Sequence, residues 1–289
     1  MRPLGGKYAT IAALTPQIVE ARTCRRGPQH VAPQCVLYAV PKDPERRAIR
    51  VCTTTSLGEA AMGSCELGFT LKVVTSHQDL LDACLVRAQA YGHHMPELGQ
   101  RLAEPDDLDY ADGTTVFVCR DKATGLATGT MRIQSSTLGP LLMESSLNLP
   151  IWLASDTRAE VTRLAVRVGV DPLTRLSLWK ASYQFCMANG LHWMAVGARN
   201  EALIRNYRRL GFIDVFDGDR LMPLAHTGGL PHRIMAFNNT TARRRWGEMR
   251  HPLFQFVFET EHSDLEASRS LQSEQPALAR ASQHLPALA

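Results

Sequence analysis

The sequence lacks the features that mark metal-binding, disulfide-rich and membrane-spanning proteins. None of its seven cysteines forms a C-x-x-C pair, and its histidines do not cluster beside them, so we expect buried reduced thiols and no metal. Reduced thiols fit a cytoplasmic location. No apolar run approaches the ~20 residues of a membrane-spanning helix, and no cleavage site follows the short apolar patch near the N-terminus.

The chain also carries little excess charge. A formal net charge of +4 on 289 residues does not indicate a nucleic-acid-binding protein, but it leaves room for a local basic face toward an acidic partner. The apolar share of 45% and the charged share of 21% are ordinary for a globular protein with a sizeable core.

Both ends of the chain read as extensions of a central domain. Residues 1–66 mix Pro, Gly, Arg and Cys without a clear period, and residues 241–289 turn into a Ser-, Gln-, Ala-, Glu- and Pro-rich tail that we expect to be disordered from about residue 262. Strand-like runs in these extensions occur at 35–40, 48–54 and 254–258.

Residues 67–240 show the alternating patterns of a mixed α/β domain. Ser76 followed by Asp79 predicts a helix start, and Asn200 predicts another. In the first half of this domain we expect a strand at 67–74, a helix at 76–92, and a hairpin that pairs 114–120 with 126–133, followed by an apolar connection at 134–157. In the second half we expect strands at 159–166, 192–196, 212–215 and 234–237, with helices at 171–190 and 200–211 between them.

A glutamate and an arginine interrupt the apolar strand that precedes the long helix. Burying Glu160 and Arg163 without partners would be costly, so we expect each to have a role or a partner. Side chains three apart in a regular strand point to opposite faces, so either the strand is bulged between the two residues or they serve different sides. We predict different sides, with Arg163 holding the aspartates or the entry loop. The plainer alternative is a cluster of ion pairs with a purely structural role, in which Glu160 pairs with Arg87 or Arg132 and Asp112 pairs with Arg163.

The last predicted helix resembles that of the GNAT acyltransferases. The phrase NEALIRNYRRLGF, from Asn200 to Phe212, matches in its capping asparagine, late tyrosine and closing Gly-Phe, and the order of hairpin and later βαβα agrees. The resemblance implies a three-layer α/β (α+β) fold with a central mixed, mostly antiparallel sheet that is splayed at its middle. In that fold the opening holds the thioester arm of an acyl donor.

Several short motifs resemble two neighbouring GNAT branches that use acyl carrier protein, the acyl-homoserine-lactone synthases and the N-acyl amino acid synthases of the FeeM type. The matching positions are Arg87 and Tyr91 on the early helix, Asp109 and Asp112 before the hairpin, Arg132 after it, and Glu160 with Arg163 in Glu-x-Thr-Arg. Tyr91-Gly92 resembles the N-acyl amino acid synthases, and Glu97 stands where the lactone synthases have tryptophan. The resemblance thus favours an amino acid acceptor, with a lactone synthase using S-adenosylmethionine as the alternative.

The turn before the long helix lacks the glycine-rich phosphate cradle of typical GNAT enzymes. Gly169 alone could match a glycine of that pattern. The Asp171 carboxylate would repel a phosphate, and Pro172 has no backbone N–H to donate to one. We therefore expect the acyl-phosphopantetheine of acyl carrier protein as the donor, no tightly bound cofactor, and coenzyme A as the alternative. The residues expected on the donor side are Val166, Arg175, Lys180, Arg199, Asn200 and Tyr207. Arg205, Arg208 and Arg209 would extend a basic rim that faces the acidic carrier protein. For each of the arginines and for Lys180, the alternative is an ordinary solvated position on a helix.

The resemblance also implies how the reaction would run. Glu160 would act as the general base on the acceptor amine, and Arg132 or Arg87 would pair with the acceptor carboxylate. Tyr91, Asp109, Asp112 and Arg163 would complete the acceptor side. The apolar connection and the long helix would enclose the alkyl chain.

Overall fold

The computed structural model describes residues 17–18, 34–39, 49–53 and 66–267 of the chain. Three short strands lie in the N-terminal part: β1 (Gln17–Ile18), β2 (Gln34–Ala39) and β3 (Ile49–Thr53). They form an antiparallel sheet in the order β1-β2-β3, in which the strand-like runs at 35–40 and 48–54 pair with each other.

The main sheet has eight strands in the order β10-β11-β8-β7-β6-β5-β4, with β9 paired beside β11. Its strands are β4 (Phe69–Val73), β5 (Thr114–Asp121), β6 (Ala127–Ser135), β7 (Arg158–Val166), β8 (Trp193–Ala198), β9 (Ile213–Asp214), β10 (Met222–Leu224) and β11 (Leu230–Asn238). β7 and β8 run parallel, whereas every other neighbouring pair of these strands is antiparallel. This is the mixed, mostly antiparallel sheet predicted from the sequence.

The parallel pair β7–β8 separates soon after it begins. Its register pairs are Arg158–Trp193, Ala159–Met194 and Glu160–Ala195, yet β7 continues to Val166 and β8 to Ala198. The sheet is therefore splayed at its middle, and Glu160 is the last β7 residue in the ladder. The predicted splay is confirmed.

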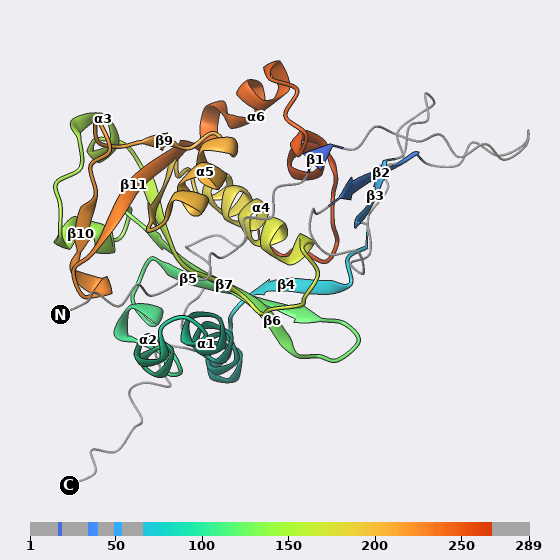
Figure 1. The fold of residues 1–289 in the computed structure, drawn as a ribbon, viewed down its shortest axis with the longest axis horizontal. Helices are drawn as coiled ribbons and strands as arrows, with labels where there is room; N and C mark the ends of the chain where they lie inside the picture. Colours follow the sequence, from blue (N-terminus) through green and yellow to red (C-terminus); the bar gives the residue numbers. More distant parts are fainter. Residues whose placement is uncertain (1–16, 19–33, 40–48, 54–65, 268–289) are drawn as a thin grey trace, which may run out of the picture.

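Helices cover both faces of the sheet, and Figure 1 shows α4 on one side and α1 on the other. On the first face, α4 (Leu173–Ala188), α5 (Glu201–Arg209) and α6 (Asn239–Glu248) enclose the largest core cluster. On the second face, α1 (His77–Gly92) buries one apolar cluster. The turn η2 (Leu142–Ser145) and the short helix α3 (Ile151–Ala154) cover a second cluster at the other end of that face.

Local sequence signals account for most helix boundaries. The Ser76 side chain accepts the N–H of Asp79 at the start of α1, and Asn200 accepts the N–H of Leu203 at the start of α5. The short helix α2 (Pro96–Arg101) and the turns η1 (Asp107–Asp109) and η3 (Ala225–Thr227) occupy connections. The apolar connection at 134–157 packs on the sheet as expected, with Met143 and Leu153 fully buried.

The C-terminal part differs from the prediction in two respects. The run at 254–258 is not a strand; Gln255–Glu259 forms the π-helical turn η4, closed by the Thr260 N–H on the Gln255 carbonyl. The aromatics at 254, 256 and 258 alternate as in a strand, but the run is short, and the adjacent residues Phe256 and Val257 are both buried, as a helical turn allows. The chain also stays ordered beyond residue 262, because Leu71 exchanges backbone hydrogen bonds with Asp264 and Glu266 along the β4 edge.

Two expectations drawn from the sequence composition concern the cysteines and the apolar segments. Cys84, Cys119 and Cys186 are buried free thiols. In the described part of the chain, no helix combines the length and apolar character needed to cross a membrane.

Candidate active site

A strip of polar side chains crosses the second face of the sheet, between the α1 cluster and the η2 cluster. Arg132 lies opposite Thr162, and Gln134 lies opposite Glu160, in the β6–β7 pairing. Because paired residues project to the same face, these side chains share the face that also carries Ala195 and Val116. The sheet thus presents its ionisable groups at the point where β7 and β8 separate.

A bulge in β7 changes where Arg163 points. Thr130 pairs with Ala165 and Arg132 with Thr162, so Arg163 and Leu164 both lie opposite Met131. Arg163 adopts φ 55°, a left-handed conformation that is strained for a side chain of its size. Its Nη2 lies 3.5 Å from Oδ2 of Asp106. The prediction that Glu160 and Arg163 serve different sides is wrong, because the bulge brings Arg163 onto the face of Glu160.

Two arginines bind a buried aspartate beside the strip. Nη1 of Arg87 lies 2.9 and 2.8 Å from the two carboxylate oxygens of Asp109. Nη1 of Arg132 lies 3.2 Å from the same carboxylate and 2.5 Å from Asp106 Oδ1, and Arg132 Nε donates to the Thr162 hydroxyl. Burial alone would raise the pKa of Asp109, but Arg87 and Arg132 outweigh it and hold that pKa below its ordinary value.

The aspartate pair of the site is Asp106 and Asp109, which corrects the predicted pair of Asp109 and Asp112. Asp106 and Asp109 accept each other's backbone N–H groups at 3.2 and 3.1 Å, and this reciprocal cap shapes η1. Asp112 is exposed and lies outside the cluster. The three aspartates are evenly spaced by three, so spacing alone could not choose between the two pairs.

Glu160 is buried at the apex of the splay and does not form the predicted ion pairs. Its Oε2 accepts the N–H of Met143 at 2.8 Å, which holds η2 against the sheet. Burial raises the pKa of Glu160 to about 7, although the Met143 amide and the charge of Arg132 both favour the carboxylate. An ion-pair cluster does form, but its carboxylates are Asp106 and Asp109 instead of Glu160 and Asp112.

Two tyrosines approach the opening from different helices. The Tyr91 hydroxyl, at the end of α1, lies 3.5 Å from the Leu164 carbonyl within the bulge. Burial raises the pKa of Tyr207 on α5 to about 12, and nearby Tyr91 adds to the shift while Arg175 opposes it. Burial likewise raises the pKa of Tyr91. Both phenols therefore stay neutral at pH 7 and can donate hydrogen bonds.

Most of the expected donor-side residues lie around the ends of β7 and β8. Val166 ends β7 and is half-buried, and Arg175 is exposed on the first turn of α4. Arg199, just beyond β8, reaches Met95 Sδ at 2.9 Å in the α1–α2 connection, and Asn200 caps α5. The remaining basic candidates on α5 are exposed, namely Arg205, Arg208 and Arg209.

Lys180 does not belong to this rim. Its side chain is 1% exposed, and Nζ donates to the carbonyls of Phe256 at 2.7 Å and Thr260 at 2.5 Å, beside the His262 ring. The C-terminal segment covers the face of α4 that carries Lys180. Sequence periodicity could not reveal this, because it depends on a segment about 80 residues further along the chain.

The start of α4 has few amides to offer an anion. Asp171 Oδ1 accepts the Leu173 N–H at 2.8 Å, and the Asp171 carbonyl accepts the Thr174 N–H at 2.9 Å. Pro172 between them has no N–H. A pyrophosphate at this helix start would therefore meet a carboxylate and amides that are already bonded.

His226 is a site residue that the sequence did not single out. It lies on η3, between β10 and β11, and its Nδ1 is buried with no hydrogen-bond partner among the described residues. Burial lowers the pKa of His226 to about 4, and the charges of Arg163, His232 and Arg132 add to the effect. Within the turn sequence AHTGG, such a histidine has no pattern that separates it from an exposed loop residue.

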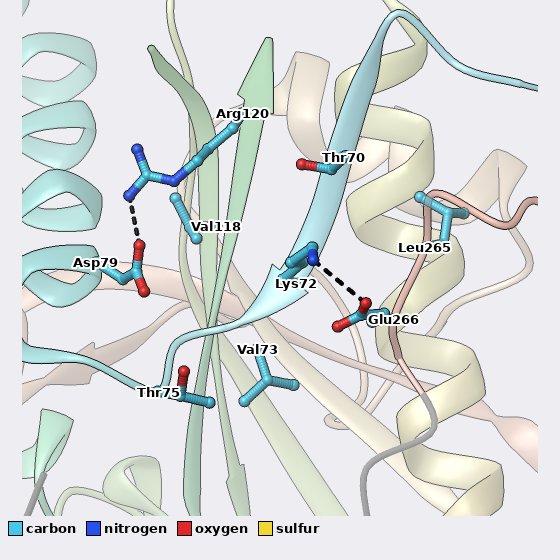
Figure 2. Close-up of a pocket in the computed structure, with 9 residues that line it drawn as sticks. All are labelled: Thr70, Lys72, Val73, Thr75, Asp79, Val118, Arg120, Leu265 and Glu266. Carbon is cyan, nitrogen blue, oxygen red and sulfur yellow. Dashed lines mark hydrogen bonds and ion pairs between the residues drawn. The ribbon is translucent and has the colours of Figure 1, made fainter. Parts of the chain in front are cut away.

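A cavity of about 610 Å³ lies elsewhere, at the β4 edge, as Figure 2 shows. Its charged groups are paired with one another: Arg120 with Asp79 at 2.5 Å, and Lys72 with Glu266 at 3.3 Å. Neither the splay nor the polar strip contributes to its lining. We therefore place the candidate active site at the splay and not in this cavity.

Comparison with known proteins finds similarity in structure but not in sequence. No family model and no curated protein sequence matches the chain. Similar solved structures include FeeM, an N-acyl amino acid synthase from uncultured soil microbes, at 15% identity and a TM-score of 0.48, covering 63% of this chain and 96% of that one.

Two further matches come from other acyl-transferring enzymes. BjaI, a coenzyme A-dependent acyl-homoserine lactone synthase solved with S-adenosylmethionine and isopentyl-coenzyme A, is 18% identical at a TM-score of 0.46, covering 75% of this chain and 100% of that one. The spermidine/spermine N-acetyltransferase SpeG from Vibrio cholerae is 14% identical at a TM-score of 0.38, covering 62% and 96%.

Proposed function

We propose that the protein is an acyltransferase that moves a fatty acyl group from the phosphopantetheine thioester of acyl carrier protein to the amino group of an amino acid. The observation that carries this proposal is the placement of Glu160. It is the last β7 residue paired with β8, and its pKa is raised to about 7 beside an arginine–aspartate cluster. A carboxyl group with such a pKa, at the opening of a splayed sheet, suits a general base.

The proposed reaction joins the acceptor nitrogen to the thioester carbon. The ammonium group of the acceptor must lose a proton before it can attack, and a carboxylate whose pKa is raised takes that proton more readily than one of ordinary pKa. Because Glu160 is 1% exposed, a water carries that proton to its carboxylate. The amine then attacks, the carbon–sulfur bond breaks, and the released thiolate takes up a proton. Backbone N–H groups of the bulged strand stabilise the oxyanion.

The donor assignment is supported by the start of α4 and by the exposed arginines. The bonded amides and the Asp171 carboxylate oppose a coenzyme A pyrophosphate, whereas a carrier protein needs only a groove for its phosphopantetheine arm. Arg175, Arg199 and Arg205 are exposed near the ends of β7 and β8. A basic rim of this kind is complementary to the acidic surface of acyl carrier protein.

In the test, the purified full-length protein is incubated with a panel of amino acids and with one of two donors, acylated acyl carrier protein or acyl-coenzyme A. Mass spectrometry then detects N-acyl products. We expect product from the carrier-protein donor, and a rate at least ~100-fold lower for Glu160→Gln. Arg244→Gln, on the exposed side of α6, is the matched control and should keep full activity. Lipid extracts from cells expressing each variant identify the natural acceptor and chain length.

Each other outcome removes a defined part of the proposal. Product from acyl-coenzyme A alone would overturn the carrier-protein donor. A lactone formed in the presence of S-adenosylmethionine would replace the amino acid acceptor. Transfer from neither donor would contradict an acyltransferase.

A further inference from the structure

We propose that Arg163 and His226 together bind the carboxylate of the acceptor, an assignment that rests on the function proposed above and makes the acceptor an α-amino acid anion. Arg163 lies in the β7 bulge on the face of Glu160, and the turn η3 that carries His226 is bonded to the end of η2 on that face through the Ala225 N–H and the Ser146 hydroxyl. The sequence had suggested Arg132 or Arg87 for this role.

Within the ion-pair cluster, which Glu160 does not join, arginines outnumber carboxylates. Three guanidinium groups, those of Arg87, Arg132 and Arg163, face the two carboxylates of Asp106 and Asp109. Arg87 and Arg132 make the short contacts, at 2.5–3.2 Å, whereas the contact of Arg163 with Asp106 is 3.5 Å long. The unbalanced positive charge therefore lies at Arg163.

Arg163 is also the arginine of this cluster that a small molecule can reach. Its side chain is 14% exposed, compared with 1% for Arg87 and Arg132. Its Nε is buried and has no hydrogen-bond partner in the described part of the chain. Arg87 has similar orphan nitrogens, but it is enclosed and Asp109 neutralises it. Burial, followed by the like charge of Arg132, lowers the pKa of Arg163, although Tyr91 and Asp106 oppose the shift.

His226 provides the second group. Arg163 is the charge with the strongest influence on its ring, followed by His232 on β11, Arg132 on β6 and Asp106 before η1. The turn that carries it is braced, since the Ala225 N–H donates to the Ser146 hydroxyl at 2.8 Å. A neutral imidazole has one N–H to donate, and a carboxylate bound to Arg163 would accept it and supply the missing negative charge.

The carboxylate of Asp106, next to Arg163, explains why the ligand would be a zwitterionic amino acid and not an anion without a positive charge. Asp106 is 40% exposed and contacts both Arg132 and Arg163, so a cationic group can approach it from the opening. A zwitterion with its carboxylate on Arg163 and His226 would direct its ammonium group toward Asp106 and the Glu160 end of the strip. A phosphate, with more negative charge, would be repelled by Asp106.

The test compares each amino acid substrate with its carboxamide, which has the same shape but no charge. We expect the wild-type protein to prefer the acid. In Arg163→Gln, kcat/KM for the acid should fall ~10- to 100-fold through a higher KM, whereas kcat/KM for the carboxamide should not change. His226→Gln should lose ~10-fold in the same way. Arg163→Lys keeps the charge and should retain part of the preference. Arg244→Gln and His192→Gln, both on exposed side chains, are the controls.

A binding measurement separates this assignment from the proposed function. Calorimetric titration of the full-length protein with amino acids and carboxamides needs no turnover, and acid-selective binding lost in Arg163→Gln supports the carboxylate site even if no transfer occurs. Transfer with equal KM for acid and carboxamide would overturn the site while the acyltransferase function stands. Equal losses for both ligands in His226→Gln would show that this residue only supports the fold. Absence of both transfer and acid-selective binding would overturn both proposals.

Discussion

At the scale of single residues, two carboxyl groups on one face of the sheet have opposite pKa shifts. Asp109 is held below its ordinary pKa because Arg87 and Arg132 donate to it, outweighing its burial. Glu160 is raised to about 7 because burial dominates and its nearest donor is a backbone amide. At neutral pH the first group stays an anion that fixes the arginines, whereas the second can exchange a proton.

The shift at Glu160 predicts a pH-dependent stability. The folded-state pKa of about 7 exceeds the ordinary value of 4.5, so this group stabilises the fold fully below pH 4.5, and the contribution is lost as the pH rises through 7. Glu160→Gln cannot titrate. Between pH 5 and 8 we expect the wild type to lose about 2 kcal/mol of unfolding free energy relative to Glu160→Gln, as measured by urea unfolding. A constant difference between the two proteins would contradict the shift.

At the scale of elements, the short turn η1 connects three parts of the fold. Its reciprocal cap directs Asp106 and Asp109 toward arginines from α1, β6 and the β7 bulge. A turn of three residues thereby sets the distance between α1 and the splayed strand.

Asp109→Asn should therefore weaken the whole domain. Removing the charge leaves Arg87 and Arg132 buried without their shared counter-ion, and we expect a loss of about 3 kcal/mol in unfolding free energy at pH 7. Asp112→Asn is the matched control, and its exposed side chain predicts a change within about 0.5 kcal/mol. Equal losses in urea unfolding would favour Asp112 as a member of the cluster after all.

At the scale of the molecule, the C-terminal segment completes the first layer and one sheet edge. Phe256 and Val257 are buried in the largest core cluster, and Asp264 and Glu266 bond to the backbone of Leu71 on β4. Lys180 joins this segment to α4 through two carbonyls at its centre. Residues 254–267 thus pack against α4 and the β4 edge of the main sheet.

Lys180→Met should release this segment while α4 remains helical. The buried carbonyls of Phe256 and Thr260 would lose their donor, with a cost of about 2–3 kcal/mol. We expect faster amide hydrogen exchange across residues 254–267, with little change in α1. Lys72→Met is the control, because its ion pair with Glu266 also touches the segment but is exposed. Equal exchange in both variants would mean that Lys180 does not hold the segment.

The sequence by itself determined the features that depend on neighbours a few residues apart. The caps at Ser76 and Asn200, the β5–β6 hairpin and the strand that carries Glu160 were all predictable, because hydrogen bonds and apolar periods within one turn or one strand produce them. From these elements the splayed mixed sheet followed by resemblance. The buried pairing of Arg87 and Arg132 with Asp109 was not predicted, because the sequence analysis placed Glu160 opposite these arginines.

Only the tertiary structure decided which of several equivalent residues take part. Asp106 in place of Asp112, Arg163 on the face of Glu160, Lys180 inside the core and His226 beside the strip all depend on segments that are distant in the chain. Burial and charge pairing are set by whatever element packs above a side chain, and a one-residue bulge reverses the face on which it lies. Local spacing carries no information about either effect.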